Sequence, residues 1–167
     1  FTEDVALKGK IISILKNNWL WEFTGNLHLP KSDEEISDGV ILDLDSQNLK
    51  FENGELVMNK NDLIKRLREN DHLVKFVSFG YKTGVQTWKE LANNKYIIER
   101  YGKEGAEKIA EIASKYKKGP YLWSFDSVEQ EKTRRSALGD SWGFGRWLNV
   151  DGDARDVDDR GRALGVC

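Results

Sequence analysis

Carboxylates and arginines near the end of the chain are the residues whose type and spacing come closest to a metal site. The stretch "DGDARDVDDRGRALGVC" begins at Asp151 and alternates acidic and basic side chains before an apolar end. A calcium loop of the EF-hand type needs oxygen ligands at positions 1, 3 and 5, Gly at position 6 and Glu at position 12. A loop that starts at Asp151 has Arg155 at its fifth position, and one that starts at Asp156 has Arg160 there. The pattern therefore favours ion pairs within the segment, and we predict no metal ion and no cofactor.

Elsewhere the sequence has no arrangement typical of a catalytic centre. Cys167 is the single cysteine, which excludes a disulfide within the chain and paired-cysteine zinc or redox motifs. His28 and His72 are not spaced as HExxH metal ligands, and no serine lies in a GxSxG elbow. The glycines of "YGKEGAEK" lack the GxxxxGK[ST] spacing of a phosphate loop and are interpreted as a turn into a helix. We therefore predict that the protein is not an enzyme and has no catalytic residues.

Composition and charge limit the partners. The 167 residues, with 39% hydrophobic and 11% aromatic content, are enough for a single domain over residues 1–167 with its own core. A formal net charge of −2, a pI near 5.8 and lysines interleaved with acids do not favour nucleic acid as a ligand. No apolar run approaches the roughly 20 residues that cross a bilayer, so we expect no membrane insertion. Because the sequence begins at Phe1 and not at Met, a processed leader stays open.

The first third of the chain is predicted to contain short strands. The segments 11–15 ("IISIL") and 19–23 ("WLWEF") are rich in β-branched and aromatic residues. A helix from Val5 to Lys16 is the alternative for the first of these, because a threonine followed by two acids precedes it.

Further along, the sequence predicts a pair of strands around a turn and four tryptophans in the core. The segments 39–45 and 54–59 lie on either side of the Asn53–Gly54 turn and are predicted to pair as strands. Tryptophans inside apolar segments are interpreted as core side chains rather than as a stacking platform. This interpretation covers Trp19, Trp21, Trp88 and Trp123.

The middle of the chain is predicted to be helical. The segment 61–70 has leucine and isoleucine on one face, and Thr87 with Glu90 forms a capping box. The clearest helix is 104–118, which has an apolar stripe and Glu–Lys pairs four residues apart. Gly119–Pro120 should end it.

Strands are predicted on both sides of these helices, at 72–80 and from 121 to 125. Helices grouped in the middle with strands before and after them indicate an α+β fold and not an alternating α/β sheet.

Residue usage changes abruptly near the end of the chain. All 17 Lys, 14 Glu and 3 Gln lie at or before Lys132, although uniform usage would put about seven of them in the last 35 residues. Asp and Arg stay abundant there, with six of 14 and six of nine, so polarity as such has not been lost. The codons of Lys, Glu and Gln share an adenine at the second position and a purine at the third. A class of codon is therefore missing from the tail.

This bias is expected where codons descend from AAC or AAT by replacement of both adenines, since such replacement never produces Lys, Glu, Gln, Met or Trp. Trp142 and Trp147 would then be constant, because the tryptophan codon has no adenine. The segment "ALGVC" at 163–167 can also be written without adenine. We predict that both tryptophans are buried beneath variable loops and that 163–167 is a strand near the core.

The tail "RRSALGDSWGFGRWLNVDGDARDVDDRGRALGVC", residues 134–167, resembles the variable region of diversity-generating retroelement variable proteins, a family that includes the major tropism determinant of a bacteriophage. The segments "WEFTGNLHLPK", "FVSFGYKTG" and "YIIERYGKEGAEKIAEIASKYKKGPYLW" also look like the scaffold of that family, in its archaeal-virus branch. The resemblance covers most of the chain from Trp19 onward and is most specific in the tail.

The resemblance implies an α+β, C-type lectin-like fold in which two main helices pack on a small twisted antiparallel sheet. In that family, reverse transcription of an adenine-mutagenised template rewrites the variable segment and changes ligand specificity on a fixed scaffold. The implied function is non-enzymatic recognition of a ligand or receptor by a hypervariable surface on residues 134–167. A rigid scaffold suits this role, because preorganisation lowers the ordering cost of binding.

The resemblance also implies which side chains face the ligand, since residues of the tail with adenine-derived codons would be the variable ones. They are Asp140, Ser141, Gly143, Phe144, Arg146, Asn149, Asp151, Asp153, Arg155, Asp156, Asp158, Asp159 and Arg160.

Two alternative functions share the implied core. A calcium-dependent glycan-binding C-type lectin would lose glycan binding when calcium is chelated. An enzyme of the formylglycine-generating type needs reactive cysteines in a pocket, and a single terminal cysteine argues against it. For the favoured function, the expected target is an unidentified protein or glycan on a host or neighbouring cell. The protein is then expected on a virion surface or a cell surface.

Overall fold

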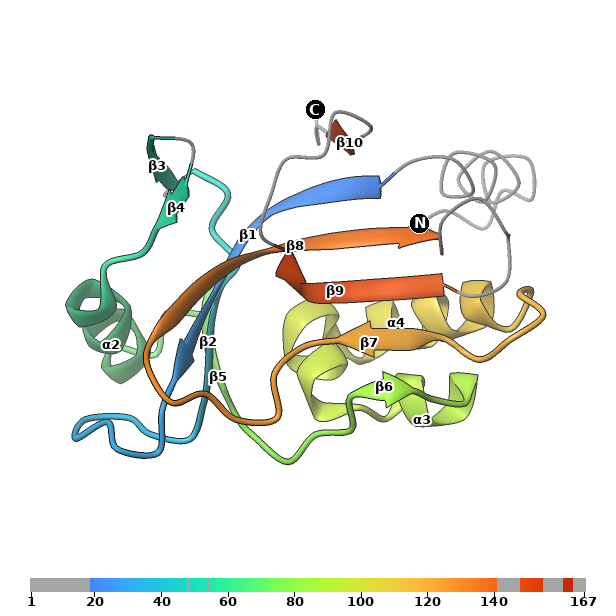
Figure 1. Ribbon diagram of the computed structural model, residues 1–167, viewed down its shortest axis with the longest axis horizontal. Coiled ribbons are helices and arrows are strands. Elements are labelled where there is room, and N and C mark those ends of the chain that lie inside the picture. The colour runs from blue at the N-terminus through green and yellow to red at the C-terminus, as the bar shows by residue number, and fades with distance from the viewer. Residues whose placement is uncertain (1–18, 48, 54, 141–147, 155–160, 164–167) are drawn as a thin grey trace.

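The structure is a computed structural model that describes residues 19–47, 49–53, 55–140, 148–154 and 161–163. Its elements in chain order (Figure 1) are β1 Trp19–Leu29, β2 Gly39–Asp43, β3 Lys50–Glu52, β4 Glu55–Val57, α2 Lys60–Arg68, β5 Val74–Ser78, β6 Gly84–Val85, α3 Trp88–Ala92, α4 Lys95–Ala113, β7 Tyr121–Trp123, β8 Lys132–Asp140, β9 Leu148–Ala154 and β10 Gly161–Ala163.

Among the described residues, eight strands form one sheet, and β3 and β4 form a separate hairpin. The order in the sheet is β5-β2-β1-β8-β9-β7-β6, and β10 pairs with the beginning of β1. Most neighbours are antiparallel, as predicted, but β7 and β9 are parallel, and so are β1 and β10. The antiparallel sheet that the resemblance implies therefore also contains two parallel pairs.

The sheet has a hydrophobic core on each face. In β2 the side chains alternate, so that Val40 and Leu42 join α4 in one cluster while Ile41 joins α2 in the other. All three are fully buried, and each such side chain contributes about 2 kcal/mol by leaving water. In Figure 1, α4 lies behind β7 and β9, and α2 lies near the opposite end of the sheet. The two main helices therefore pack on opposite faces of the sheet.

Each helix begins at a capping side chain. Asn59 accepts a hydrogen bond from a backbone amide in the first turn of α2, which confirms the helix predicted at 61–70. The predicted capping box is also confirmed: the Thr87 amide donates to Glu90 Oε2 at 2.7 Å, and the Glu90 amide donates to Thr87 Oγ1 at 3.2 Å. Asn94 caps α4 in the same way as Asn59 caps α2.

The longest helix differs from its prediction at both ends. It was expected at 104–118, whereas α4 spans Lys95–Ala113. Its first part escapes pattern analysis because Gly102 interrupts the helix with a φ of 72°. Beyond Ala113 the backbone bonds tighten, and the Lys115 amide donates to the Ile112 carbonyl at 3.0 Å. The chain therefore leaves the helix before the predicted stop.

The pairing predicted between 39–45 and 54–59 is wrong. The turn at Asn53, which has a φ of 52°, does join two strands, but the partner of β4 is Lys50–Glu52. All five residues of β2 are buried, and β2 pairs with β1 on one edge and with β5 on the other. A strand buried in this way needs partners on both edges, which a solvent-exposed hairpin does not supply.

Other local predictions are confirmed where the structure describes them. The strands expected at 19–23, 72–80 and 121–125 contain the start of β1, β5 and β7. The segment 11–15 and its helical alternative at 5–16 lie outside the described residues. None of the described helices is both long and apolar enough to span a membrane.

Candidate ligand-binding surface

The tail supplies strands in the middle of the sheet. Four of the thirteen predicted ligand-facing residues lie in described strands: Asp140 ends β8, while Asn149, Asp151 and Asp153 belong to β9. Trp142, Trp147 and residues 164–167 lie outside the described residues. So do the remaining candidates, Ser141, Gly143, Phe144, Arg146, Arg155, Asp156, Asp158, Asp159 and Arg160.

Strand β9 presents one face to α4 and the other away from it. Leu148 and Val150 are buried in the cluster that includes α4. Asn149 and Asp151 alternate with them and therefore lie on the opposite face of the sheet. There they neighbour Tyr121 and Trp123 of β7 through the parallel register and small residues of β8 through the antiparallel one. This face of β7, β8 and β9 is called the β7–β9 surface below.

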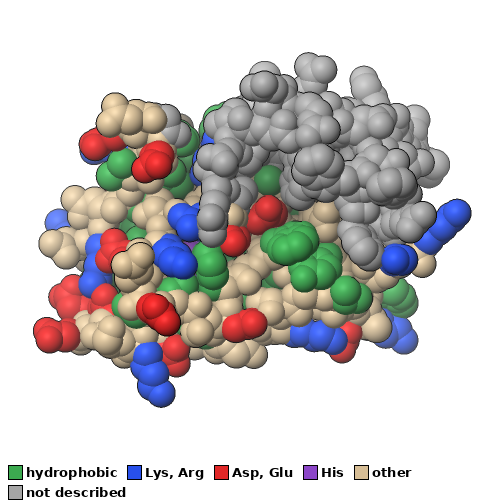
Figure 2. Space-filling view, in the orientation of Figure 1, with side chains coloured by type: hydrophobic (Ala, Val, Ile, Leu, Met, Phe, Trp, Pro, Cys, Tyr) green, Lys and Arg blue, Asp and Glu red, His purple; other side chains and the backbone are tan. Residues whose placement is uncertain are grey.

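Two aromatic residues of β7 lie on the β7–β9 surface. The rings of Tyr121 and Trp123 are 4.3 Å apart between centroids. Trp123 has 48% of its surface exposed, and in Figure 2 hydrophobic side chains gather over the position of β7 beside acidic ones. An exposed indole and a nearby carboxylate are suited to contact with a ligand.

The prediction that tryptophans are core residues is wrong for two of them. Trp88 is 47% exposed and Trp123 is 48% exposed. Apolar neighbours in the sequence therefore did not indicate burial of these two side chains. Trp19 and Trp21 lie in β1, and their side chains are outside the described residues.

Asn149, one of the predicted ligand-facing residues, is buried in the structure. It is 3% exposed, and Trp123 Nε1 donates to its Oδ1 at 3.4 Å. Its side chain therefore orients the indole rather than facing solvent.

Asp151 and Asp153 partly determine their own backbone. The Asp153 amide donates to Asp151 Oδ1 at 2.7 Å, and Arg134 Nε donates to Asp153 Oδ1 at 2.8 Å. Both acids are half-buried. Burial raises the pKa of Asp151 to about 6, and the negative charge of Asp153 acts in the same direction. The two acidic side chains therefore help to hold the backbone of β9.

Gly152, between these two acids, is fixed by what lies beneath it. A Cβ at this position would be 2.9 Å from Tyr96 Cζ and closer still to the hydroxyl. Its carbonyl accepts a hydrogen bond of 3.0 Å from Asn26 Nδ2, which also donates to Ser136 Oγ at 2.7 Å. The register between β8 and β9 shifts at this point, so that β9 bulges towards α4. Glycine is required because the backbone approaches α4 too closely for a side chain.

A buried polar network carries this bulge. Asn26 Oδ1 accepts from Tyr96 OH at 3.1 Å and from Arg100 Nη1 at 2.8 Å. Arg100 also pairs with Glu22 through its Nε at 2.9 Å, and Tyr101 OH donates to the other oxygen of Glu22 at 2.6 Å. Burial raises the pKa of Tyr101 well above its usual value, so the phenol stays a donor. The network joins β1 and α4 beneath β9.

Sequence reasoning missed these supporting residues. Asn26 and Arg100 are 74 positions apart, and neither lies in a motif. The closest sequence signal was Asn94, a residue type that favours helix starts. It caps α4, the helix that carries Tyr96 and Arg100.

Three carboxylates elsewhere in the described chain converge on an arginine. Arg66 Nε is 2.7 Å from Asp71, while its two terminal nitrogens are 3.4 Å from Asp43 and 3.5 Å from Asp45. The guanidinium occupies the centre of the cluster. Within the described residues, no group of three or more His, Cys, Asp or Glu side chains is arranged to hold a metal ion.

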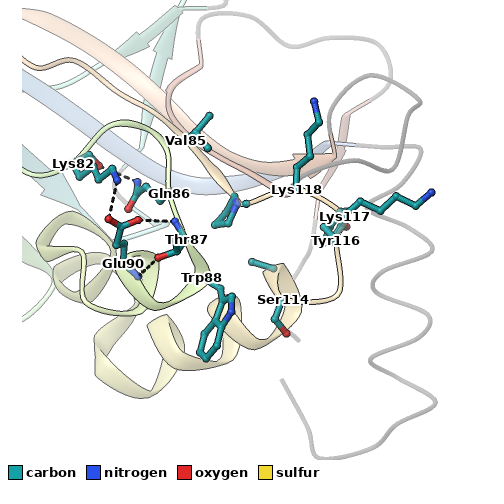
Figure 3. Close-up of a pocket in the computed structure, with 13 residues that line it drawn as sticks. Lys82, Val85, Gln86, Thr87, Trp88, Glu90, Ser114, Tyr116, Lys117 and Lys118 are labelled. Atoms are coloured by element: carbon teal, nitrogen blue, oxygen red, sulfur yellow. Dashed lines mark hydrogen bonds and ion pairs between the residues drawn. The ribbon is translucent and has the colours of Figure 1, made fainter.

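A separate groove of about 530 Å³ lies beside α3 and the end of α4 (Figure 3). Val85 and Trp88 are exposed on its wall, and at its rim Lys82 Nζ pairs with Glu90 Oε1 at 2.9 Å. Its lining comes entirely from residues 82–120, before the change in residue usage. The groove therefore belongs to the part of the chain that precedes the tail.

Comparison with solved structures decides the fold. A chain described under the words "Accommodation of massive sequence variation in Nanoarchaeota by the C-type lectin fold" superposes with a TM-score of 0.53 over 84% of this chain and 73% of that chain. The protein has the C-type lectin fold. The fold class predicted from the resemblance is thereby confirmed. The two chains share 15% sequence identity, so the likeness is one of fold. No family model matches the sequence, and a search of curated proteins found no match.

Proposed function

We propose that this protein is a non-enzymatic binding protein of the diversity-generating retroelement kind, and that residues 134–167 form its diversified ligand-binding surface. The observation that carries the proposal is a coincidence of boundaries. Lys, Glu and Gln are absent after Lys132, and Lys132 is also the first residue of β8. The sequence with the unusual codon signature therefore begins where the chain enters the middle of the sheet.

The scaffold supports side-chain diversity in β9. One anchor of β9 to the layer below is the hydrogen bond from Asn26 Nδ2 to the carbonyl of Gly152, which uses the backbone of β9 and not a side chain. We propose that the repeat encodes Gly152 by a codon without adenine, so that mutagenesis leaves this residue in place. Substitutions at residues 151 and 153 would leave this anchor in place, which keeps the ordering cost of binding low.

The similarity of fold supports the same proposal. The matched protein is described in terms of massive sequence variation accommodated by a C-type lectin fold. An exposed indole beside a carboxylate provides contacts that suit recognition. We propose a protein or glycan on a host or neighbouring cell as the partner, and display on a virion or cell surface as the setting.

The genomic neighbourhood provides a direct test. We expect a reverse transcriptase gene beside an imperfect repeat of the sequence that encodes residues 134–167. The two copies should differ almost only where the repeat has adenine. Absence of both the repeat and the reverse transcriptase gene would overturn the proposal.

A binding experiment tests the display role. Tails built by replacing the adenines of the repeat would be grafted onto residues 1–133 and used to isolate targets from host-surface extracts. Different tails should retain the thermal midpoint of the parent but capture different targets. Identical targets for every tail would show that recognition occurs elsewhere. Calcium chelation is included as a control, since the calcium-dependent lectin alternative requires that it abolish capture.

A further inference from the structure

We propose that Trp123 and Asp151 together form a docking point for a lysine or arginine side chain of a protein partner. Trp123 is the constant part of this point and Asp151 the diversified part. The proposal rests on the function proposed above, because it divides one binding surface between scaffold and tail.

The two residues are adjacent on neighbouring strands. Trp123 and Asp151 are register partners in the parallel pairing of β7 with β9, so their side chains leave the same face of the sheet. The hydrogen bond from Trp123 Nε1 to Asn149 Oδ1 and the ring of Tyr121 hold the indole. Nearly half of the tryptophan stays exposed, with 48% of its surface accessible. The aromatic face is therefore preorganised for a ligand.

The chemistry of the pair selects a cation. The face of an indole attracts an ammonium or guanidinium group within about 6 Å of the ring centre. Among the described residues, Asp153 has an ion-pair partner in Arg134, whereas no ion pair is found for Asp151. A basic side chain lying over Trp123 would supply the missing positive charge. An anionic ligand would instead be repelled by the carboxylate of Asp151, and an apolar ligand would bury this carboxylate without a partner.

The position of Trp123 in the sequence makes it a constant anchor. It precedes Lys132, and the tail with the unusual residue usage begins after that residue. Every diversified form of the protein would then display the same indole next to a changing residue 151. An aspartate there gives this form its preference for basic partners, and another residue would change the preference without moving the anchor.

Titration with a hexalysine peptide in about 150 mM salt tests the docking point, because salt at this level weakens non-specific attraction. Binding is followed by calorimetry and by tryptophan fluorescence. We expect hexalysine to bind the parent saturably and hexaglutamate not to bind it. Trp123→Ala and Asp151→Asn should each weaken hexalysine binding by about tenfold or more. The thermal midpoint of each variant is measured to show that it is folded.

Matched controls separate the docking point from general acidity. Trp88→Ala removes another half-exposed tryptophan, and Asp62→Asn removes one negative charge from the exposed side of α2; neither should weaken hexalysine binding more than about twofold. Equal losses in the controls and in the docking-point variants would overturn the inference, as would unchanged binding by Trp123→Ala.

The two proposals fail separately. Absence of hexalysine binding together with a diversified genomic repeat would refute the docking point and leave the display function in place. Hexalysine binding that depends on Trp123 in the absence of any repeat would refute diversification but keep the docking point as a fixed basic-ligand site.

Discussion

The hydroxyl of Tyr96 lies where a side chain at residue 152 would have to begin. Gly152 is therefore the point at which β9 comes closest to α4, and a built Cβ there would be 2.9 Å from Tyr96 Cζ. Asp151 and Asp153 lie on either side of this contact, the first in register with Trp123 of β7 and the second bonded to Arg134 of β8. Gly152 therefore makes the contact with α4, while the acids beside it carry the surface chemistry.

Substitution of Gly152 by alanine should destabilise the fold. We expect Gly152→Ala to lower the free energy of unfolding by about 1–3 kcal/mol, because the methyl group overpacks against Tyr96. Urea denaturation measures the change. Tyr96→Phe in the same chain removes the nearest atom and should restore part of the loss, which a double-mutant cycle would reveal as coupling. An alanine variant as stable as the parent would contradict the close approach.

Removal of Arg100 should cost more than removal of an exposed arginine. Arg100→Met leaves the carboxylate of Glu22 without its positively charged partner in a mostly buried site, and we expect a loss of about 3 kcal/mol. The control is Arg68→Met, since Arg68 is exposed and its 3.5 Å contact with Glu35 is worth under about 1 kcal/mol. Thermal and urea unfolding provide the comparison.

A second substitution identifies the cause of that loss. Glu22→Gln added to Arg100→Met removes the unpaired charge and should recover stability. If the double variant is no more stable than Arg100→Met alone, lost packing and not the orphaned carboxylate explains the cost.

Local features of this fold could be predicted from the sequence, because neighbouring residues create them. Thr87 and Glu90 form their capping box, Asn53 forms its turn, and Glu104 meets Lys108 at 2.6 Å one helical turn away. The α+β class followed from the order of such segments.

Features that depend on distant residues could not be predicted. Asn26 bonds to the carbonyl of Gly152 across 126 positions, and no spacing rule links them. The exposure of Trp123 likewise depends on which strands flank β7, while its own neighbours, Leu122 and Tyr121, suggest an ordinary apolar segment. The candidate surface was therefore predicted from codon usage and resemblance, whereas its supporting layer required the structure.

Ionisation of Asp151 should lower stability near neutral pH. Burial raises the pKa of this carboxyl from 3.8 to about 6, so the folded protein binds a proton more tightly than the unfolded chain. The resulting stabilisation is complete below about pH 4 and is lost as the pH rises through about 6. Charged or titratable groups around it are Asp153 on the same strand and, on α4, Arg100 and Tyr96.

The variant Asp151→Asn isolates this effect, because the amide is neutral at every pH and retains an oxygen for the Asp153 amide. Relative to the parent, the variant should gain stability between pH 4 and pH 7.5. Urea unfolding at both pH values measures the difference. A gain of the same size at both values would show that the pKa of Asp151 is not raised.

Protonation of His28 should destabilise the fold in acid. His28 is fully buried, with the ring of Phe125 at 4.8 Å and that of Phe79 at 6.4 Å between centroids. The pKa of His28 is lowered from 6.5 to about 3, mainly by burial and also by the positive charges of Arg134 and Lys132. Because the folded-state pKa is depressed, the contribution of His28 to stability is complete above about pH 6.5 and is lost as the pH falls towards 3.

We expect this loss to reach about 2 kcal/mol at pH 4.5 and to vanish in His28→Leu, whose side chain has no proton to gain. Urea unfolding of both proteins at pH 7 and pH 4.5 measures it. At pH 7 the variant should differ from the parent by about 1.5 kcal/mol or less, because leucine is apolar and of similar volume.

His72→Gln, which changes an exposed histidine, should retain the acid loss of the parent, because His28 is still present. Since Asp151 acts in the opposite direction over the same pH range, His28→Leu should be compared with the parent at each pH rather than across pH. An acid loss that persists unchanged in His28→Leu would place its origin in another group.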